Sequence, residues 1–137
     1  MIGTIHEHRV QVRYGETDQM GVVHHANYLA YLEESRTRMM ADRGCSYAEV
    51  ERQGWGLPVR RATLRFLAPA VYEDQLVVRT HVERIRAASV VFVSEVVRES
   101  DGLKLARGEI ELACIRLDER GQGPQPIPDA LRTSLGG

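Results

Sequence analysis

The segment spanning residues 26–43 constrains the fold more than any other part of the sequence, because its apolar residues have the spacing of a helix. Its first half, ANYLAYL, is apolar almost all round. A helix of this kind must be covered by other elements on several sides. Gly44 is expected to end it. Its second half carries charged residues (Glu33, Glu34, Arg36 and Arg38), of which Glu34 and Arg38 are four apart and are expected to pair on a solvated face. We therefore expect this helix to lie at the centre of the fold.

The rest of the sequence supplies strands that can surround such a helix. Residues 6–14 alternate between apolar and polar side chains, which predicts a strand before the helix. Ser46 and Glu49 have capping-box spacing and predict a short second helix. Short polar connections, which favour antiparallel neighbours, join four further predicted strands (residues 57–68, 75–86, 88–99 and 103–117). The expected fold class is α+β, with a five-stranded antiparallel sheet wrapped around one long central helix.

Length and pattern place residues 1–137 in a single domain. Residues 120–137 are rich in Gly and Pro, so we expect them to form a peripheral tail. The predicted strand at 88–99 has apolar side chains on both faces, with Phe92 and Val96 on one and three valines on the other (Val91, Val93 and Val97). A second copy of the chain is the simplest cover for the outer face. We therefore expect a homo-oligomer that is at least a dimer.

The charge and cysteine content limit the possible partners. The formal net charge is −1, which provides no strong field to attract nucleic acid or an anionic membrane, so neither is an expected partner. Cys45 and Cys114 lie far apart without metal-ligand spacing, which is typical of reduced intracellular thiols. No apolar run reaches the length of a membrane span, and the first residues lack the apolar core of a signal peptide. A cytoplasmic location is therefore expected.

The loop before the long helix concentrates ionisable residues where a buried element begins. Asp18 precedes the helix with Gly21, His24 and His25 between them. A carboxylate can attack a substrate directly or activate water. The first N–H groups of a helix lack internal partners and can stabilise a negatively charged oxygen. Gly21 would permit the turn that returns the loop to the helix.

Structural explanations compete with a functional one in this loop. Asp18 could cap the helix or close an Asx-turn, and His25 could be a packed histidine that hydrogen-bonds to the backbone. His24 is expected to be solvated or to lie at an interface, and Glu16 is expected to be solvated on the loop. Asp18, His24 and His25 are not expected to bind a metal, because adjacent histidines usually diverge and the sequence offers no further ligand at suitable spacing.

The motif YGETDQMGVVHHANYLAYLEESRTRMM resembles the signature of the 4-hydroxybenzoyl-CoA thioesterase and YbgC-type acyl-CoA thioesterase family. The likeness extends over most of the chain, including the segment LPVRRATLRFLAPAVYEDQLVVRT. It implies a hotdog fold, in which the sheet wraps the helix, and an enzyme that hydrolyses an acyl-CoA thioester. It also implies a homo-oligomer that is a tetramer made of two dimers.

The same resemblance assigns roles to individual residues. Asp18 corresponds to the catalytic carboxylate, as nucleophile or general base. The backbone N–H of His25 corresponds to the group that polarises the carbonyl, and the side chains of His25 and Tyr14 correspond to positions that assist catalysis. A histidine at position 25 points to the YbgC-type branch. Three further residues of the motif are assigned to substrate binding (Gly21, Val23 and Tyr28).

Coenzyme A would be part of the substrate, and we expect no separate cofactor. Its phosphates call for basic residues at one edge of the site. Arg61 and Arg86 are the predicted contacts, although each could equally belong to an ordinary solvated strand face. Around Arg86 the sequence RAAS replaces the denser basic run of the hydroxybenzoyl branch, so the phosphate contacts are expected to be looser here or to come from a partner subunit.

Two other classes of protein remain open. A hydratase or dehydratase of the hotdog fold would also act on acyl thioesters, but hydratases of this fold resemble D-x-N-x-x-H, and here Met20 stands at the position of the asparagine. A non-catalytic acyl-CoA-binding protein would keep the pocket without needing Asp18. Assays of thioester hydrolysis separate these alternatives.

Overall fold

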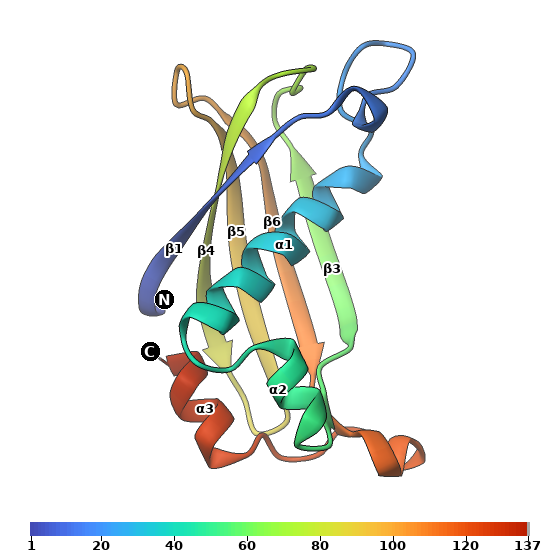
Figure 1. Cartoon of the computed structure of the whole chain (residues 1–137), viewed down its shortest axis with the longest axis vertical. Coiled ribbons are helices and arrows are strands. Elements are labelled where there is room, and N and C mark those ends of the chain that lie inside the picture. The colour runs from blue at the N-terminus through green and yellow to red at the C-terminus, as the bar shows by residue number, and fades with distance from the viewer. Residues whose placement is uncertain (137) are drawn as a thin grey trace.

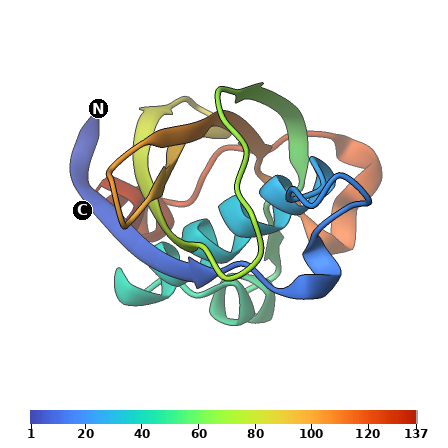
Figure 2. The same ribbon diagram turned by 90° about the horizontal axis from the view of Figure 1, so that it is seen from above.

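The computed structural model describes residues 1–136, and its main feature is a five-stranded antiparallel sheet that wraps around one long helix (Figures 1 and 2). The strand order is β1-β4-β5-β6-β3. The helix is α1 (Ala26–Asp42), and the strands have the following bounds: β1 Ile2–Gln11, β3 Val59–Phe66, β4 Gln75–Ile85, β5 Ser89–Arg98 and β6 Lys104–Ala113. The predicted fold class is confirmed.

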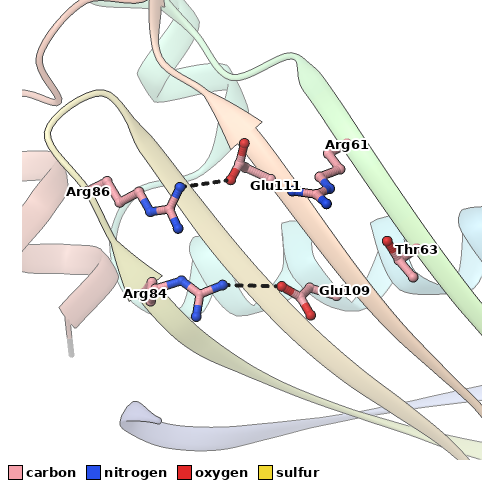
Figure 3. A pocket seen from close by; sticks show the side chains of 6 residues that line it. All are labelled: Arg61, Thr63, Arg84, Arg86, Glu109 and Glu111. Atoms are coloured by element: carbon pink, nitrogen blue, oxygen red, sulfur yellow. Dashed lines mark hydrogen bonds and ion pairs between the residues drawn. The ribbon is translucent and has the colours of Figure 1, made fainter.

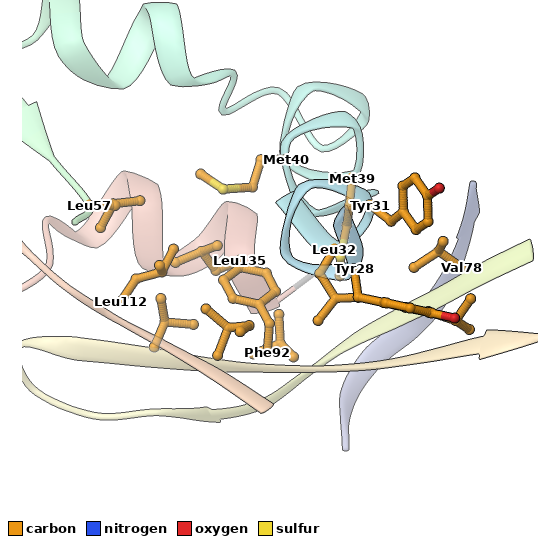
Figure 4. Close-up of a cluster of buried hydrophobic side chains, with 14 of the residues drawn as sticks. Tyr28, Tyr31, Leu32, Met39, Met40, Leu57, Val78, Phe92, Leu112 and Leu135 are labelled. Carbon is orange, nitrogen blue, oxygen red and sulfur yellow. The ribbon is translucent and has the colours of Figure 1, made fainter. Parts of the chain in front are cut away.

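The core lies between α1 and the concave face of the sheet (Figure 4). Alternate residues of β4 face inward, and Leu76, Val78 and Val82 have no exposed surface. Phe92 on β5 and Leu32 on α1 are each 1% exposed. This alternation explains why a period of two in the sequence marked the strands correctly.

The end of α1 and the second helix also follow the prediction. Gly44 has a φ of 79°, the left-handed conformation that ends a helix most easily with glycine. Ser46 Oγ accepts the Glu49 N–H at 3.3 Å and starts α2 (Tyr47–Arg52). The Glu49 carboxylate contacts Arg52 and Gln53 instead of the Ser46 backbone, so only half of the expected capping box forms.

Two of the predicted strands have different ends in the structure. The first strand covers Ile2–Gln11 instead of residues 6–14, because the chain turns into the short 3-10 helix η1 (Tyr14–Glu16), where the Glu16 N–H donates to the Arg13 carbonyl. The predicted strand at 103–117 is divided into β6 and the short strand β7 (Ile115–Arg116). Strand β7 pairs with β2 (Trp55–Gly56) in a separate two-stranded sheet.

The expectation that residues 120–137 are a peripheral tail is wrong for much of that segment. After the 3-10 helix η2 (Leu117–Gln122), the chain forms α3 (Asp129–Gly136) beside α2 at one end of the sheet (Figure 1). Leu131 is 7% exposed and Leu135 is 1% exposed, so α3 closes this end of the core. Ile127 is also buried, and its N–H donates to the Ala87 carbonyl.

The outer face of the sheet is covered by side chains of the same chain. Val91 and Val93 on β5 are each 1% exposed although they point away from α1. Charged side chains from the two neighbouring strands meet across β5, in the ion pairs Arg84–Glu109 (3.3 Å) and Arg86–Glu111 (3.7 Å) (Figure 3). A second subunit, which the sequence suggested as the simplest cover, is therefore not needed to bury Val91 and Val93.

Across residues 1–136, no helix has both the length and the apolar character that crossing a membrane requires.

Candidate functional site

The loop between η1 and α1 is fixed by backbone pairing on both sides. Thr17 and Val23 form an antiparallel bridge, and the Asp18 N–H donates to the Val22 carbonyl at 2.8 Å. At the tip of the loop, Gly21 has a φ of 80° and its N–H donates to the Asp18 carbonyl. Glycine adopts this left-handed conformation without steric cost, so Gly21 makes the turn that its position in the sequence predicted.

The Asp18 carboxylate combines a structural contact with a free oxygen. Its Oδ1 accepts the Met20 N–H at 2.9 Å and the Val22 N–H at 3.4 Å, which is the Asx-turn that the sequence left open. Within residues 1–136, Oδ2 has no hydrogen-bond partner, and the residue is exposed. The carboxylate therefore holds the loop with one oxygen and leaves the other free for chemistry.

Asp18 lines a cleft of about 400 Å³ between the loop, the start of α1 and the end of β3. The Tyr28 ring packs edge-on against Phe66, with 5.3 Å between the ring centroids, and Tyr28 is only 3% exposed. Burial raises the pKa of the Tyr28 hydroxyl, which keeps it uncharged. Most of the other residues lining the cleft are apolar (Val22, Val23, Leu67, Ala68 and Pro69). A charged oxygen thus stands beside an apolar wall.

His25 lies in the same cleft, at the first turn of α1. The neighbouring N–H groups are occupied: Ala26 donates to His24 Nδ1 at 3.2 Å, and Asn27 donates to the His24 carbonyl at 3.0 Å. The His25 N–H has no such partner among the described residues. Sequence reasoning expected several free amides here, whereas the structure leaves this one for an oxyanion.

His24 is exposed, in agreement with the expectation of a solvated residue, and its ring also has a structural contact. Besides accepting the Ala26 N–H, the ring stacks on that of His25, with 4.2 Å between the centroids. An acceptor two residues before the N–H that it binds is the pattern of a capping side chain. The spacing of two residues between His24 and Ala26 was visible in the sequence, but histidine is seldom considered as a capping residue.

Tyr14 lies near Asp18 but outside the cleft that contains His25. It is 76% exposed, and its ring packs edge-on against Tyr72 at 5.6 Å. Together with Asp18 it lines a separate shallow hollow, to which Gly21 also belongs. Of the predicted site residues, Asp18, Val23, His25 and Tyr28 share the cleft, whereas Tyr14 and Gly21 lie on the other side of Asp18.

Glu16, which was expected to be solvated, is a hydrogen-bonded residue with a side chain only 17% exposed. Its Oε1 accepts the Tyr31 hydroxyl at 2.8 Å, and its carbonyl accepts Asn27 Nδ2 at 2.9 Å. Burial, together with the nearby Glu16 carboxylate, raises the pKa of Tyr31. Asn27 and Tyr31 are four residues apart and therefore lie on the same face of α1, a spacing that could have indicated a shared partner.

Arg61 and Arg86 lie on the outer face of the sheet, in a hollow of about 260 Å³ (Figure 3). This hollow and the cleft of Asp18 share no lining residue. Arg86 pairs with Glu111, whose pKa is lowered first by its hydrogen bond with Arg60 and also by the charge of Arg86. Arg61 forms no ion pair with any residue that the structure describes. Within one chain, these arginines do not reach the predicted active site.

Comparison with known proteins gives consistent matches over nearly the whole chain. The model of the thioesterase-like superfamily matches residues 12–135. The chain is 31% identical over 122 residues to the acyl-CoA thioester hydrolase YbgC of Escherichia coli, and the match covers 89% of each protein.

Solved structures are also similar to this chain over nearly its whole length. A hypothetical protein from Thermus thermophilus has a TM-score of 0.87 and 35% identity, covering 96% of this chain and 95% of that one. A 1,4-dihydroxy-2-naphthoyl-CoA thioesterase from Synechocystis has a TM-score of 0.88 and 26% identity, covering 96% of both chains.

Proposed function

The chain belongs to the thioesterase-like superfamily, and from that premise we propose that it is an acyl-CoA thioester hydrolase with its active site in the cleft around Asp18. The observation that carries this proposal is the pairing of two uncommitted groups in one cleft. Oδ2 of Asp18 is an oxygen without a hydrogen-bond partner in residues 1–136, and the His25 N–H is a donor that also has no partner among these residues. Both Asp18 and His25 line the cleft. Thioester hydrolysis requires one group of each kind.

The proposed chemistry uses the two groups on opposite sides of the thioester. The His25 N–H donates to the carbonyl oxygen, where negative charge accumulates as the carbon becomes tetrahedral. Asp18 either removes a proton from the attacking water or attacks the carbon itself. The C–S bond then breaks and coenzyme A leaves as a thiolate. When Asp18 acts as the base, the thiolate takes up the proton that Asp18 removed from the water; when Asp18 attacks the carbon itself, the thiolate takes a proton from solvent. In the covalent variant, water hydrolyses the acyl-Asp18 intermediate in a second step.

The apolar wall of the cleft is the proposed place for the acyl group. Val23, Tyr28 and Phe66 line the cleft beside Asp18 and present carbon surface to it. Because the hydroxyl of Tyr28 stays uncharged, no charge other than the Asp18 carboxylate needs to face the reacting carbon. The His25 side chain, which also lines the cleft, is proposed to assist. Tyr14 approaches Asp18 from the neighbouring hollow and is proposed to assist from that side.

We propose that the enzyme is a homodimer joined at β3, and that two dimers form a tetramer. Strand β3 is an edge of the sheet, and apolar residues along it and just after it are half exposed: Val59 50%, Phe66 51% and Leu67 53%. An exposed edge strand invites pairing with a second chain. Because Phe66 and Leu67 also line the cleft, a partner at this edge would cover it.

This assembly would also give the arginines a role. Two β3 strands that pair antiparallel about a two-fold axis place the Arg61 end of one strand beside the Phe66 end of the other. Arg61 of one copy would then approach the cleft of the other, where its unpaired guanidinium could bind a phosphate of coenzyme A. Arg86, in the same hollow as Arg61, is proposed to add a second contact.

The proposal is tested with purified protein and a panel of short aliphatic, long aliphatic and aromatic CoA esters, with release of free thiol as the signal. Cys45 and Cys114 are buried, which limits the background from the protein. We expect turnover of at least one class of ester. Binding of CoA esters without release of thiol would favour the non-catalytic alternative, and loss of the enoyl absorbance of an unsaturated ester would favour a hydratase. Light scattering gives the oligomeric state.

A further inference from the structure

We propose that Glu16 is a positioning residue, which fixes the carboxylate of Asp18 relative to the His25 N–H. The inference rests on the proposed thioester hydrolysis and goes beyond it, because Glu16 itself lines neither the cleft nor the hollow beside it. Its side chain and its backbone carbonyl both bind groups from the elements that flank the loop.

The side chain of Glu16 joins the end of the first strand region to the helix. Oε1 accepts the backbone N–H of Arg13 at 2.9 Å and the hydroxyl of Tyr31 at 2.8 Å. Tyr31 is 2% exposed and lies in the second turn of α1, so this donor is held by the core. A hydrogen bond between a hydroxyl and a carboxylate is stronger than one between neutral groups.

The backbone carbonyl of Glu16 makes a second connection to the helix. It accepts the His24 N–H at 2.9 Å and Asn27 Nδ2 at 2.9 Å. Glu16 therefore accepts from five donors, two of Arg13 before the loop and three from the segment that ends the loop and begins α1. The carboxylate and carbonyl together close the loop onto the helix.

Glu16 is close in sequence to Asp18, and its carbonyl binds the residue before His25, so its hydrogen bonds affect the placement of both reacting groups. Asp18 follows it by two residues, and His25 immediately follows His24, whose N–H is bound to the Glu16 carbonyl. Any displacement of Glu16 therefore changes the separation between the two reacting groups. A misplacement of about 1 Å can lower the rate of an enzyme by about a hundredfold, even when the displaced residue does not touch the substrate.

The hydrogen-bond acceptor on Glu16, not its charge, is the feature that this model requires. The charged group facing its carboxylate is Arg13, whose Nη2 lies 3.5 Å from Oε2 and whose side chain is 84% exposed, and a pair this exposed contributes little. The pKa of Tyr31 is raised, so its hydroxyl stays a donor at neutral pH. A glutamine at position 16 keeps an Oε1 that can accept the same two donors.

The test compares kcat and KM for Glu16→Ala, Glu16→Gln, Tyr31→Phe and the double variant Glu16→Ala/Tyr31→Phe, with thermal unfolding of each. Tyr47→Phe, a partly buried tyrosine on α2 away from the cleft, is the matched control. For Glu16→Ala and Tyr31→Phe we expect kcat to fall by about tenfold while KM changes by less than about twofold. Glu16→Gln should keep most of the wild-type kcat, and the double variant should be no slower than Glu16→Ala.

Several results would overturn the inference. A Tyr31→Phe variant with wild-type kcat and a lower Tm would show that the hydrogen bond serves stability alone. Losses of kcat that multiply in the double variant would show that the two residues act independently. A wild-type enzyme without thioesterase activity would overturn both this inference and the proposed function, whereas an active wild type with unaffected variants would overturn this inference alone.

Discussion

Gly108 on β6 lies directly against Leu32 on α1, and a Cβ at position 108 would overlap the Cδ2 of Leu32. The same Cβ would lie 3.0 Å from Cδ2 of Leu64 on β3. The absence of a side chain at Gly108 thus lets the sheet approach the helix closely at the middle of the core. Leu32 is buried in that core and Leu64 packs against it, so a side chain at position 108 would require both leucines to shift.

Gly108→Ala is therefore expected to lower the free energy of unfolding by about 1–3 kcal/mol, the usual cost of overpacking a core. Urea denaturation of the variant and the wild type measures the difference. Gly121→Ala is the control, because nothing lies within 4 Å of a Cβ at that position. Equal stability of Gly108→Ala and the wild type would show that α1 does not pack as closely as described.

His25→Pro should separate the backbone N–H of residue 25 from its side chain. His25 has a φ of −54°, which proline can adopt, so the substitution removes the N–H while keeping the φ of residue 25. Loss of one oxyanion donor typically lowers kcat by about 10²–10³-fold. His25→Ala keeps the N–H and should lose less activity. Comparable kcat values for the two variants would place the catalytic contribution of this residue in the imidazole instead.

We expect protonation of His6 to lower the free energy of unfolding under mildly acidic conditions. Its pKa is lowered from the ordinary value of 6.5, chiefly by burial, and to a smaller extent by His8, Arg43 and Arg38, while Asp42 partly opposes the shift. The unfolded chain therefore binds a proton at this residue more readily than the folded chain does. Stability from the neutral His6 is complete above pH 6.5 and is lost as pH falls through the lower pKa of the folded state.

The Tm of the wild type should therefore decrease as the pH is lowered from about 7.5 to about 5.5, a range that brackets the ordinary pKa of histidine. His6→Gln, which has no titrating group at this position, should show a smaller decrease over the same range. Calorimetry of both proteins at a series of pH values makes the comparison. Parallel curves for the two proteins would rule out His6 as a source of the pH dependence.

The sequence predicted the parts of this molecule that depend on neighbouring residues. Alternation in β4 and helical spacing in α1 reflect which side of each element is buried, so both were recognised. Asp18, His25 and Tyr28 lie within a few residues of one another, and a single loop and helix start bring them together. Local pattern placed the helix and strands and drew attention to Asp18 and His25, whereas the resemblance to the family motif supplied Tyr28 and the expected roles of all three.

Features that depend on distant parts of the chain were missed. Phe66 and Leu67 enter the cleft from β3, far from Asp18 in sequence, and only the fold brings them there. Glu109, which lies opposite Val93 on β6, pairs with Arg84 from the far side of β5, and this contact between distant strands could not be predicted from the sequence. Arg36, one of the charged residues in the second half of α1, is only 4% exposed, which its charge did not indicate. Periodicity cannot show which outward side chains are covered by neighbouring elements.

The most direct test of the proposed function is kcat of Asp18→Asn for the CoA ester that the wild type hydrolyses fastest. An asparagine keeps Oδ1, which can still accept the Met20 N–H and hold the loop, but it lacks the negative charge needed to attack or to activate water. Asp74→Asn is the matched control, since Asp74 closes a similar turn by accepting the Val71 N–H at 3.0 Å and does not line the cleft.

We predict that kcat of Asp18→Asn falls by at least about a hundredfold, the usual contribution of a catalytic acid or base, while the variant still binds the CoA ester and unfolds near the wild-type temperature. Asp74→Asn should keep wild-type turnover. An Asp18→Asn enzyme that retains most of its kcat would contradict the assignment of Asp18 as the catalytic carboxylate.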